Sequence, residues 1–182
     1  MNTLILFVLA LGLAMDCFAI SISNSSISGL VKPGIPLKVA IAFTFAHVLM
    51  LFLGYRLGAM IQSMFEGFEP ITALFILLFI GGKMIMDARK RKPQSKVFDI
   101  NEARVIITLS IAGSMDAFLA GVATGILEMH FYLAAILVAT TVFIFSLAGM
   151  AGGKNFGLMY AKNIGMIGGI LIILAGIGMV LG

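Results

Sequence analysis

The chain has 182 residues, of which 61% are hydrophobic and 11% are charged, and its mean hydropathy is +1.15. A soluble domain usually carries about 25% charged residues, so this composition excludes an ordinary soluble protein. The formal net charge of +4 is small, and the single cysteine excludes both an internal disulfide and a Cys-x-x-Cys redox motif.

Six apolar segments follow one another along the chain, separated by short polar connections. Each is close to the ~20 residues that a helix needs to cross the hydrocarbon core of a bilayer. Together they leave no room for a soluble domain, so we predict an all-α membrane protein with six transmembrane helices. The segments are residues 4–23, 37–61, 70–86, 104–127, 131–152 and 164–182.

Basic residues are concentrated in the odd-numbered connections. Six lie in or beside the third connection, whereas the second and fourth carry Glu66, Glu69 and Glu128 without any lysine or arginine. The positive-inside rule then predicts that the odd connections face the cytoplasm and that both termini lie on the outer side. The six basic residues are Arg89, Lys90, Arg91, Lys92, Lys96 and Arg104. We predict that Lys83 snorkels toward the cytoplasmic surface and reaches Asp87 one turn further on.

The chain contains an internal repeat, which is clearest around two aspartates. Met15-Asp16-Cys17-Phe18-Ala19 recurs one hundred residues later as Met115-Asp116-Ala117-Phe118-Leu119. Glycines match as well, since Gly54 and Gly81 correspond to Gly149 and Gly176. Three spans per copy require the second copy to be inverted, which is a common plan for secondary transporters.

This repeat divides the chain into two halves and a connection. We predict a first three-helix repeat at 1–92, a basic cytoplasmic linker at 93–103 and a second three-helix repeat at 104–182. Glycines spaced four residues apart, such as the Gly54/Gly58 and Gly121/Gly125 pairs, predict that helix backbones approach closely.

The two aspartates are the strongest candidates for a functional site. A charged side chain at the bilayer centre costs at least about 2.5 kcal/mol, so two in matching contexts indicate chemistry. Asp16, Asp116 and His47 all fall near mid-membrane, and Thr141 lies at a comparable depth. We predict that these side chains converge in one cavity.

Two carboxylates suit a divalent cation, which can replace the protons that a repelling pair retains. Oxygen ligands favour Mg²⁺, Ca²⁺ or Mn²⁺, and imidazole or thioether ligands shift the preference toward transition metals. Met15 and Met115 precede the aspartates and are candidate sulfur ligands, although packing is the commoner role for methionine. Cys17 is better explained by packing, and His47 fits a ligand and a hydrogen-bonded packing residue equally well.

An ion gradient is the expected energy source, because no GxxxxGK[ST] phosphate loop is present. Moving a divalent cation out of a cell costs about 4.6 kcal/mol per 100 mV of inside-negative potential. Exchange of two protons for one cation would be electroneutral and would remove this cost.

At these residues the chain resembles the bacterial manganese efflux pump family. The resemblance rests on the two Met-Asp motifs, on Leu53-Gly54-Tyr55-Arg56-Leu57-Gly58 and on Phe79-Ile80-Gly81-Gly82-Lys83-Met84-Ile85, and it covers essentially the whole chain. It implies export of Mn²⁺ across the bacterial inner membrane, with Mn²⁺ as a transported substrate rather than a cofactor and Asp16 and Asp116 as the membrane acidic residues. Where the family leads us to expect a polar residue, often glutamate, this chain has His47, and Leu51 replaces a nearby proline.

Other functions remain open. An exporter of another metal or of a cationic amino acid fits the same pattern. A membrane protein that transports nothing is a further alternative, in which the matching aspartates would only stabilise the pairing of helices. An intramembrane hydrolase using His47 with Ser110 or Ser114 lacks the Gly-x-Ser-x-Gly elbow, so we do not expect an enzyme. We expect no nucleic-acid partner, and homo-oligomerisation is compatible with the sequence.

Overall fold

The computed structural model describes residues 2–27, 34–65, 67–90 and 102–181, and all secondary structure in these ranges is helical. The prediction of an all-helical protein is therefore confirmed. Predicted features outside these ranges include Lys32, Glu66, Arg91, Lys92, Lys96 and most of the linker 93–103. The elements are α1 (Asn2–Ile27), α2 (Ile35–Ile61), the 3-10 helix η1 (Gln62–Phe65), α3 (Glu69–Lys90), α4 (Ala103–Gly113), α5 (Met115–Ile126) and α6 (Phe131–Leu181).

Glycines mark the starts of α2 and α3. Gly34 has a φ of 92° directly before α2, and a proline follows in the first turn of that helix. Gly67 has a φ of 84°, and its N–H donates to the Glu69 carboxylate at 3.0 Å. Left-handed backbone favours glycine and a proline is tolerated in the first turn, so the sequence sets both helix starts locally.

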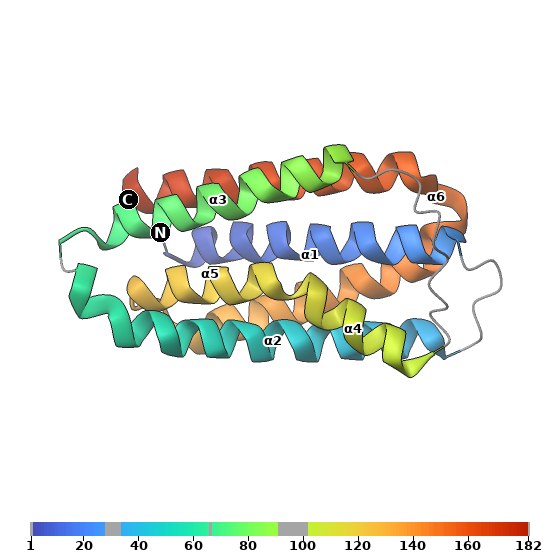
Figure 1. The fold of residues 1–182 in the computed structure, drawn as a ribbon, viewed down its shortest axis with the longest axis horizontal. Helices are drawn as coiled ribbons and strands as arrows, with labels where there is room; N and C mark the ends of the chain where they lie inside the picture. Colours follow the sequence, from blue (N-terminus) through green and yellow to red (C-terminus); the bar gives the residue numbers. More distant parts are fainter. Residues whose placement is uncertain (1, 28–33, 66, 91–101, 182) are drawn as a thin grey trace.

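Five segments are long and apolar enough to cross a membrane, and a shorter apolar helix follows at Asn163–Gly178. This sixth segment belongs to α6, which is helical throughout but reverses direction between its two apolar parts (Figure 1). The five spans are Thr3–Ser23, Ile35–Met64, Glu69–Arg89, Ala103–Ile126 and Phe131–Gly152.

The two parts of α6 run in opposite directions along α1. In the first part, the Thr141 hydroxyl donates to the Ala10 carbonyl, and the Met150 carbonyl accepts from the Ser25 hydroxyl. Residue numbers therefore rise in the same direction along α1 and this part of α6, so the two are parallel. In the second part, Gly168 lies against Met15. Further along, Gly178 lies near Ile5, so residue numbers rise along this part of α6 while they fall along α1, and the two are antiparallel. Successive segments thus alternate in direction, and the chain ends lie at the same end of the bundle (Figure 1).

The extensive helix contacts join α1 with α6, α2 with α5 and α3 with α6. The α2–α5 contact is made backbone to backbone, as the glycine spacing predicted. A Cβ on Gly54 would collide with the Phe118 carbonyl, and a Cβ on Gly121 would collide with the Leu51 carbonyl. Glycine is therefore required where these two helices touch.

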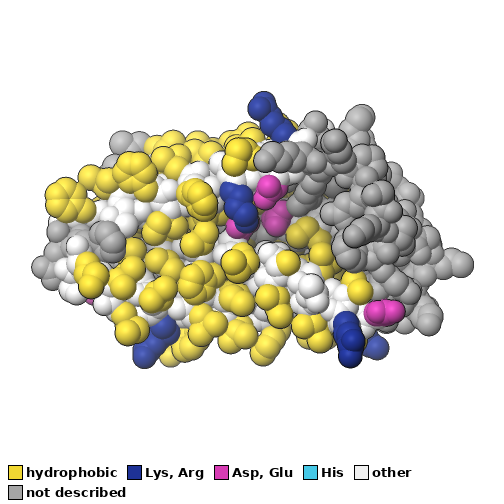
Figure 2. Space-filling view, in the orientation of Figure 1, with side chains coloured by type: hydrophobic (Ala, Val, Ile, Leu, Met, Phe, Trp, Pro, Cys, Tyr) yellow, Lys and Arg dark blue, Asp and Glu magenta, His cyan; other side chains and the backbone are white. Residues whose placement is uncertain are grey.

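Apolar side chains cover most of the described surface. Figure 2 shows them over the described part of one face, with charged side chains near its edges and one group of both signs in its middle. Phe45, Phe75 and Phe79 are each about two-thirds exposed. Such a large apolar surface fits lipid contact rather than water.

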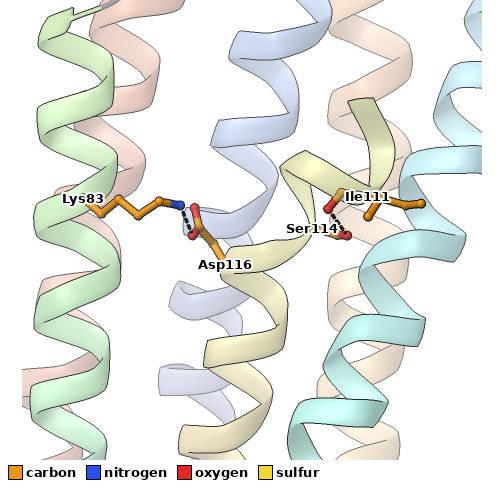
Figure 3. A network of polar contacts seen from close by, with 4 residues as sticks. All are labelled: Lys83, Ile111, Ser114 and Asp116. Atoms are coloured by element: carbon orange, nitrogen blue, oxygen red, sulfur yellow. Dashed lines mark hydrogen bonds and ion pairs between the residues drawn. The ribbon is translucent and has the colours of Figure 1, made fainter. Parts of the chain in front are cut away.

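The fourth predicted segment, 104–127, differs from expectation because it is not one uninterrupted helix. α4 ends at Gly113 and α5 begins at Met115, with Ser114 between them at φ −91° and ψ 0°. The Ser114 N–H and hydroxyl both bond back to carbonyls of α4, at Ser110 and Ile111. These bonds cap α4, and the chain changes direction there (Figure 3).

Candidate functional site

The break between α4 and α5 sets the position of Asp116. This residue lies in the first turn of α5 and is only 6% exposed. The free N–H groups and the dipole of a helix N-terminus favour a negative charge. Discontinuous helices of this kind are a common feature of the substrate sites of transporters.

The Lys83 side chain reaches across from α3 to this carboxylate. Its Nζ lies 2.7 Å from Asp116 Oδ1, in both a hydrogen bond and an ion pair (Figure 3). The expectation that Lys83 would only snorkel and reach Asp87 was incomplete, because the closest partner lies on another helix. Local spacing predicted the i, i+4 neighbour but could not predict a partner 33 residues away.

Asp16 comes from the half-buried side of α1, and α1 contacts α5. The charges of Asp16 and Asp116 interact with each other, and both interact with the Lys83 ammonium. The two aspartates that the repeat singled out are thus brought into one electrostatic group.

His47 lies fully inside the bundle beside Cys17. Its Nδ1 is 2.9 Å from the Phe43 carbonyl, and its Nε2 is 3.2 Å from Cys17 Sγ. A carbonyl only accepts, so Nδ1 carries the proton, and Nε2 then accepts from the thiol. His47 interacts electrostatically with Asp116, and Cys17 with both aspartates. This imidazole–thiol pair is therefore within electrostatic range of the carboxylates, although the four side chains do not form one cluster of metal ligands.

The remaining predicted ligands are oriented in different directions. Met115 is 56% exposed, on the outside of the bundle. Met15 is half-buried and packs against Gly168 of α6. The Thr141 hydroxyl donates to the Leu137 carbonyl at 2.7 Å. None of these three contacts an aspartate in any bond that the structure records.

No three histidine, cysteine, aspartate or glutamate side chains in the described ranges are close enough together to hold one metal ion. The arrangement instead offers two carboxylates with a competing ammonium. Ions that prefer oxygen can be held by one or two carboxylates together with water. The described group thus provides oxygen atoms from two carboxylates but no third protein ligand of these types.

The serines of the hydrolase alternative have other partners. Ser110 donates to the Ile106 carbonyl at 2.8 Å and Ser114 to the Ile111 carbonyl at 3.0 Å. His47 accepts from Cys17 instead of from a serine. Nucleophilic catalysis needs a hydroxyl bonded to its base, so the geometry gives this alternative no support.

Comparison with known proteins points to a single family. The family model described as "putative manganese efflux pump" matches residues 31–181. No solved structure matches the chain.

Individual relatives match nearly from end to end. A putative manganese efflux pump MntP of Aliarcobacter butzleri is 32% identical over 174 residues, covering 96% of this chain and 97% of the relative. A protein of the same description from Methanothermobacter thermautotrophicus is 32% identical over 181 residues, covering 100% and 97%. One from Rippkaea orientalis is 33% identical over 170 residues, covering 93% and 90%.

Proposed function

The chain belongs to the putative manganese efflux pump family, and from this we propose that it exports Mn²⁺ across the bacterial inner membrane in exchange for protons. Metal efflux is the activity that the names of its relatives state. The substrate, the coupling and the residues involved are our proposal for this chain.

The observation that carries the proposal is that α1 and α5 touch and that the Asp16 charge acts on Asp116 across this contact. These residues belong to the two matching motifs, on α1 and α5. Two carboxylate groups can exchange their protons for one divalent cation, which binds between their oxygens. We therefore assign the transported ion to this pair, with water completing its coordination.

His47 is the next candidate, because it is within electrostatic range of Asp116. Its Nε2 would have to leave the Cys17 thiol before it could bind a metal. Met15 and Thr141 could contribute only after α1 and α6 shift relative to each other, and Met115 only after α5 turns inward. These four side chains remain secondary candidates for the pathway.

Reciprocal helix contacts support an inverted repeat of residues 1–92 and 104–182. Gly54 on α2 meets Phe118 on α5, and its counterpart Gly149 on α6 meets Phe18 on α1. Two further contacts are related in the same way. Gly81 meets Gly169, and the counterparts of these two residues in the other repeat, Gly176 and Leu74, also meet. An inverted repeat with a two-fold axis would produce such pairs of equivalent contacts.

Proton exchange follows from the charges. Two carboxylates that lose two protons when one Mn²⁺ binds keep the charge of the site constant through the cycle. The membrane potential, worth about 4.6 kcal/mol per 100 mV for a divalent ion, would then not oppose export. Uptake of Mn²⁺ into inside-out proteoliposomes should respond to an imposed pH gradient, and indifference to it would rule out the exchange.

A growth assay tests the function. The chain should restore growth in high Mn²⁺ to a bacterium that lacks its manganese exporter, and should lower its cellular manganese. Asp16→Asn and Asp116→Asn should each abolish rescue at normal membrane levels, because an amide cannot replace the carboxylate charge. Glu102→Gln removes an exposed carboxylate before α4 and should rescue fully.

Rescue by both aspartate variants would assign these residues a structural role and overturn the proposal. The same assay with Zn²⁺, Co²⁺, Cd²⁺ and lysine separates the alternatives. The neighbouring nitrogen and sulfur of His47 and Cys17 favour another transition metal as the second candidate substrate. Protection against lysine would instead identify a cationic amino-acid exporter.

A further inference from the structure

The ion pair between Lys83 and Asp116 lies at the proposed transport site. The ammonium is 2.7 Å from one carboxylate oxygen, and the side chains are 39% and 9% exposed. Figure 3 shows the lysine extended from α3 toward α5, with its tip at the carboxylate. Asp116 is thus already bound to a cation that belongs to the protein.

Lys83 has a second acidic neighbour on its own helix. Asp87 lies one turn further along α3, is exposed, and interacts electrostatically with the Lys83 ammonium. Side chains four residues apart on a helix face each other, and the flexible lysine stem lets its ammonium reach more than one position. The ammonium can therefore leave Asp116 without losing an acidic partner.

A divalent cation and this ammonium cannot share Asp116 favourably. A hard divalent ion binds a carboxylate oxygen at about 2.0–2.6 Å, and the Lys83 Nζ already occupies one of the binding positions around Oδ1. Like charges at such short range repel strongly, particularly away from bulk water. Metal binding at Asp116 thus requires the ammonium to move.

We propose that Lys83 is a tethered competitor of the transported cation, holding Asp116 in the metal-free carrier and moving to Asp87 when metal binds. This inference rests on the proposed function. It gives an exporter a way to release its ion, because the ammonium displaces the metal without having to diffuse to the site. Once the metal has left, a proton can take the place of the ammonium on Asp116, which keeps the exchange at two protons for one Mn²⁺.

The competitor belongs to one half of the chain only. The sequence offset that matches Gly81 to Gly176 also matches Lys83 to Gly178, so the second repeat has a glycine where the first has this lysine. Competition should therefore act through Asp116, whereas Asp16 contributes attraction to both the metal and the ammonium. Lys83 is a positioning residue in this scheme rather than a metal ligand.

Equilibrium binding of Mn²⁺ to the full chain in lipid nanodiscs tests the proposal. Lys83→Met should bind Mn²⁺ at least about fivefold more tightly than the wild type, the lower end of ordinary coupling between sites. Its export should nevertheless slow, because release is impaired. Lys83→Arg keeps a cation at this position and should restore near wild-type affinity, whereas Lys38→Met removes an exposed cation in the first turn of α2 and should change nothing.

A second variant tests the same idea and should change the Mn²⁺ affinity in the opposite direction. Asp87→Asn removes the alternative partner, so the ammonium should stay on Asp116 and Mn²⁺ should bind more weakly. This variant serves as the test if Lys83→Met does not fold. Unchanged or weaker binding by Lys83→Met, or unchanged binding by Asp87→Asn, overturns the competitor role.

The wild type separates this inference from the proposed function. If the wild type binds Mn²⁺ and Asp116→Asn abolishes this binding, the proposed function is supported whatever the Lys83 variants show. If only the Lys83 and Asp87 variants give unexpected affinities, the competitor role alone is overturned. A wild type that neither binds nor exports Mn²⁺ removes both.

Discussion

The Cys17 thiol and the His47 ring lie in contact inside the bundle, within electrostatic range of the carboxylates. The thiol is fully buried, and it is the only cysteine in the chain. Burial decides whether a cysteine reacts, since a reagent must first reach the sulfur. This residue therefore reports directly on access to the interior.

Labelling with a membrane-permeant maleimide should show this burial. We expect Cys17 to react slowly in native membranes and completely after denaturation in SDS. His47→Ala should speed the native reaction, because it removes the ring that covers the sulfur. Fast labelling of the wild type in membranes would contradict the buried position.

A matched control places the thiol elsewhere. The double variant Cys17→Ser/Ser63→Cys carries its single cysteine at an exposed position in η1 and should label quickly without denaturation. The two labelling rates then compare buried and exposed thiols in the same fold.

Single residues also show where sequence reasoning reached its limit. Asp16 and Asp116 were found because their contexts repeat, and Lys83 was noticed as a charge in an apolar segment. Its partner was predicted from helix spacing, so the contact with Asp116 was missed. The contact between Cys17 and His47 was missed for the same reason, because it joins α1 to α2 across 30 residues.

At the scale of elements, the contact between α2 and α5 depends on glycine. Gly121→Ala should destabilise the protein by about 1–3 kcal/mol, the usual range for overpacking. The added Cβ collides with the Leu51 carbonyl, and backbone atoms can yield only if a helix moves. A fall in melting temperature, measured by thermal unfolding in detergent, would show this effect.

Gly82→Ala is the matched control on α3. A Cβ there meets nothing within 4 Å, so the melting temperature should stay the same or rise slightly, because alanine favours a helix over glycine. Equal losses in both variants would mean that the α2–α5 contact has no special requirement for glycine.

Most element boundaries followed closely from hydropathy, because the apolar runs end at polar or glycine residues. The exception is α6, which joins the predicted segments 131–152 and 164–182 in one helix. α2 at Ile35–Ile61 compares with the predicted 37–61, and α3 at Glu69–Lys90 with 70–86. The break at Ser114 was not predicted. Ser110, Gly113 and Asp116 make its surroundings the most polar part of the span, and a Gly–Ser pair is a common place for a helix to kink. The prediction used the hydropathy of the whole segment and therefore missed this local signal.

For the whole molecule, the charge distribution makes a topological prediction. Both ends of the chain should face the periplasm, as the positive-inside rule implies. Alkaline phosphatase fused after residue 182 should be active, and a fluorescent protein fused there should be dark.

Insertion of the same reporters within 93–101 should give the reverse pattern, because this basic segment is predicted to be cytoplasmic. A fluorescent C-terminal fusion with inactive phosphatase would invert the proposed orientation.

The pairing of helices constrains how such a molecule can move. α1 packs on α6, α2 on α5 and α3 on α6, so every one of these contacts joins residues before the linker to residues after it. The two sequence halves are interleaved and cannot swing apart as blocks without separating α2 from α5 at their glycines. A movement that alternately exposes Asp116 would instead keep α2 with α5, and any shift of α3 against α5 would have to stretch or break the bond from Lys83 to Asp116.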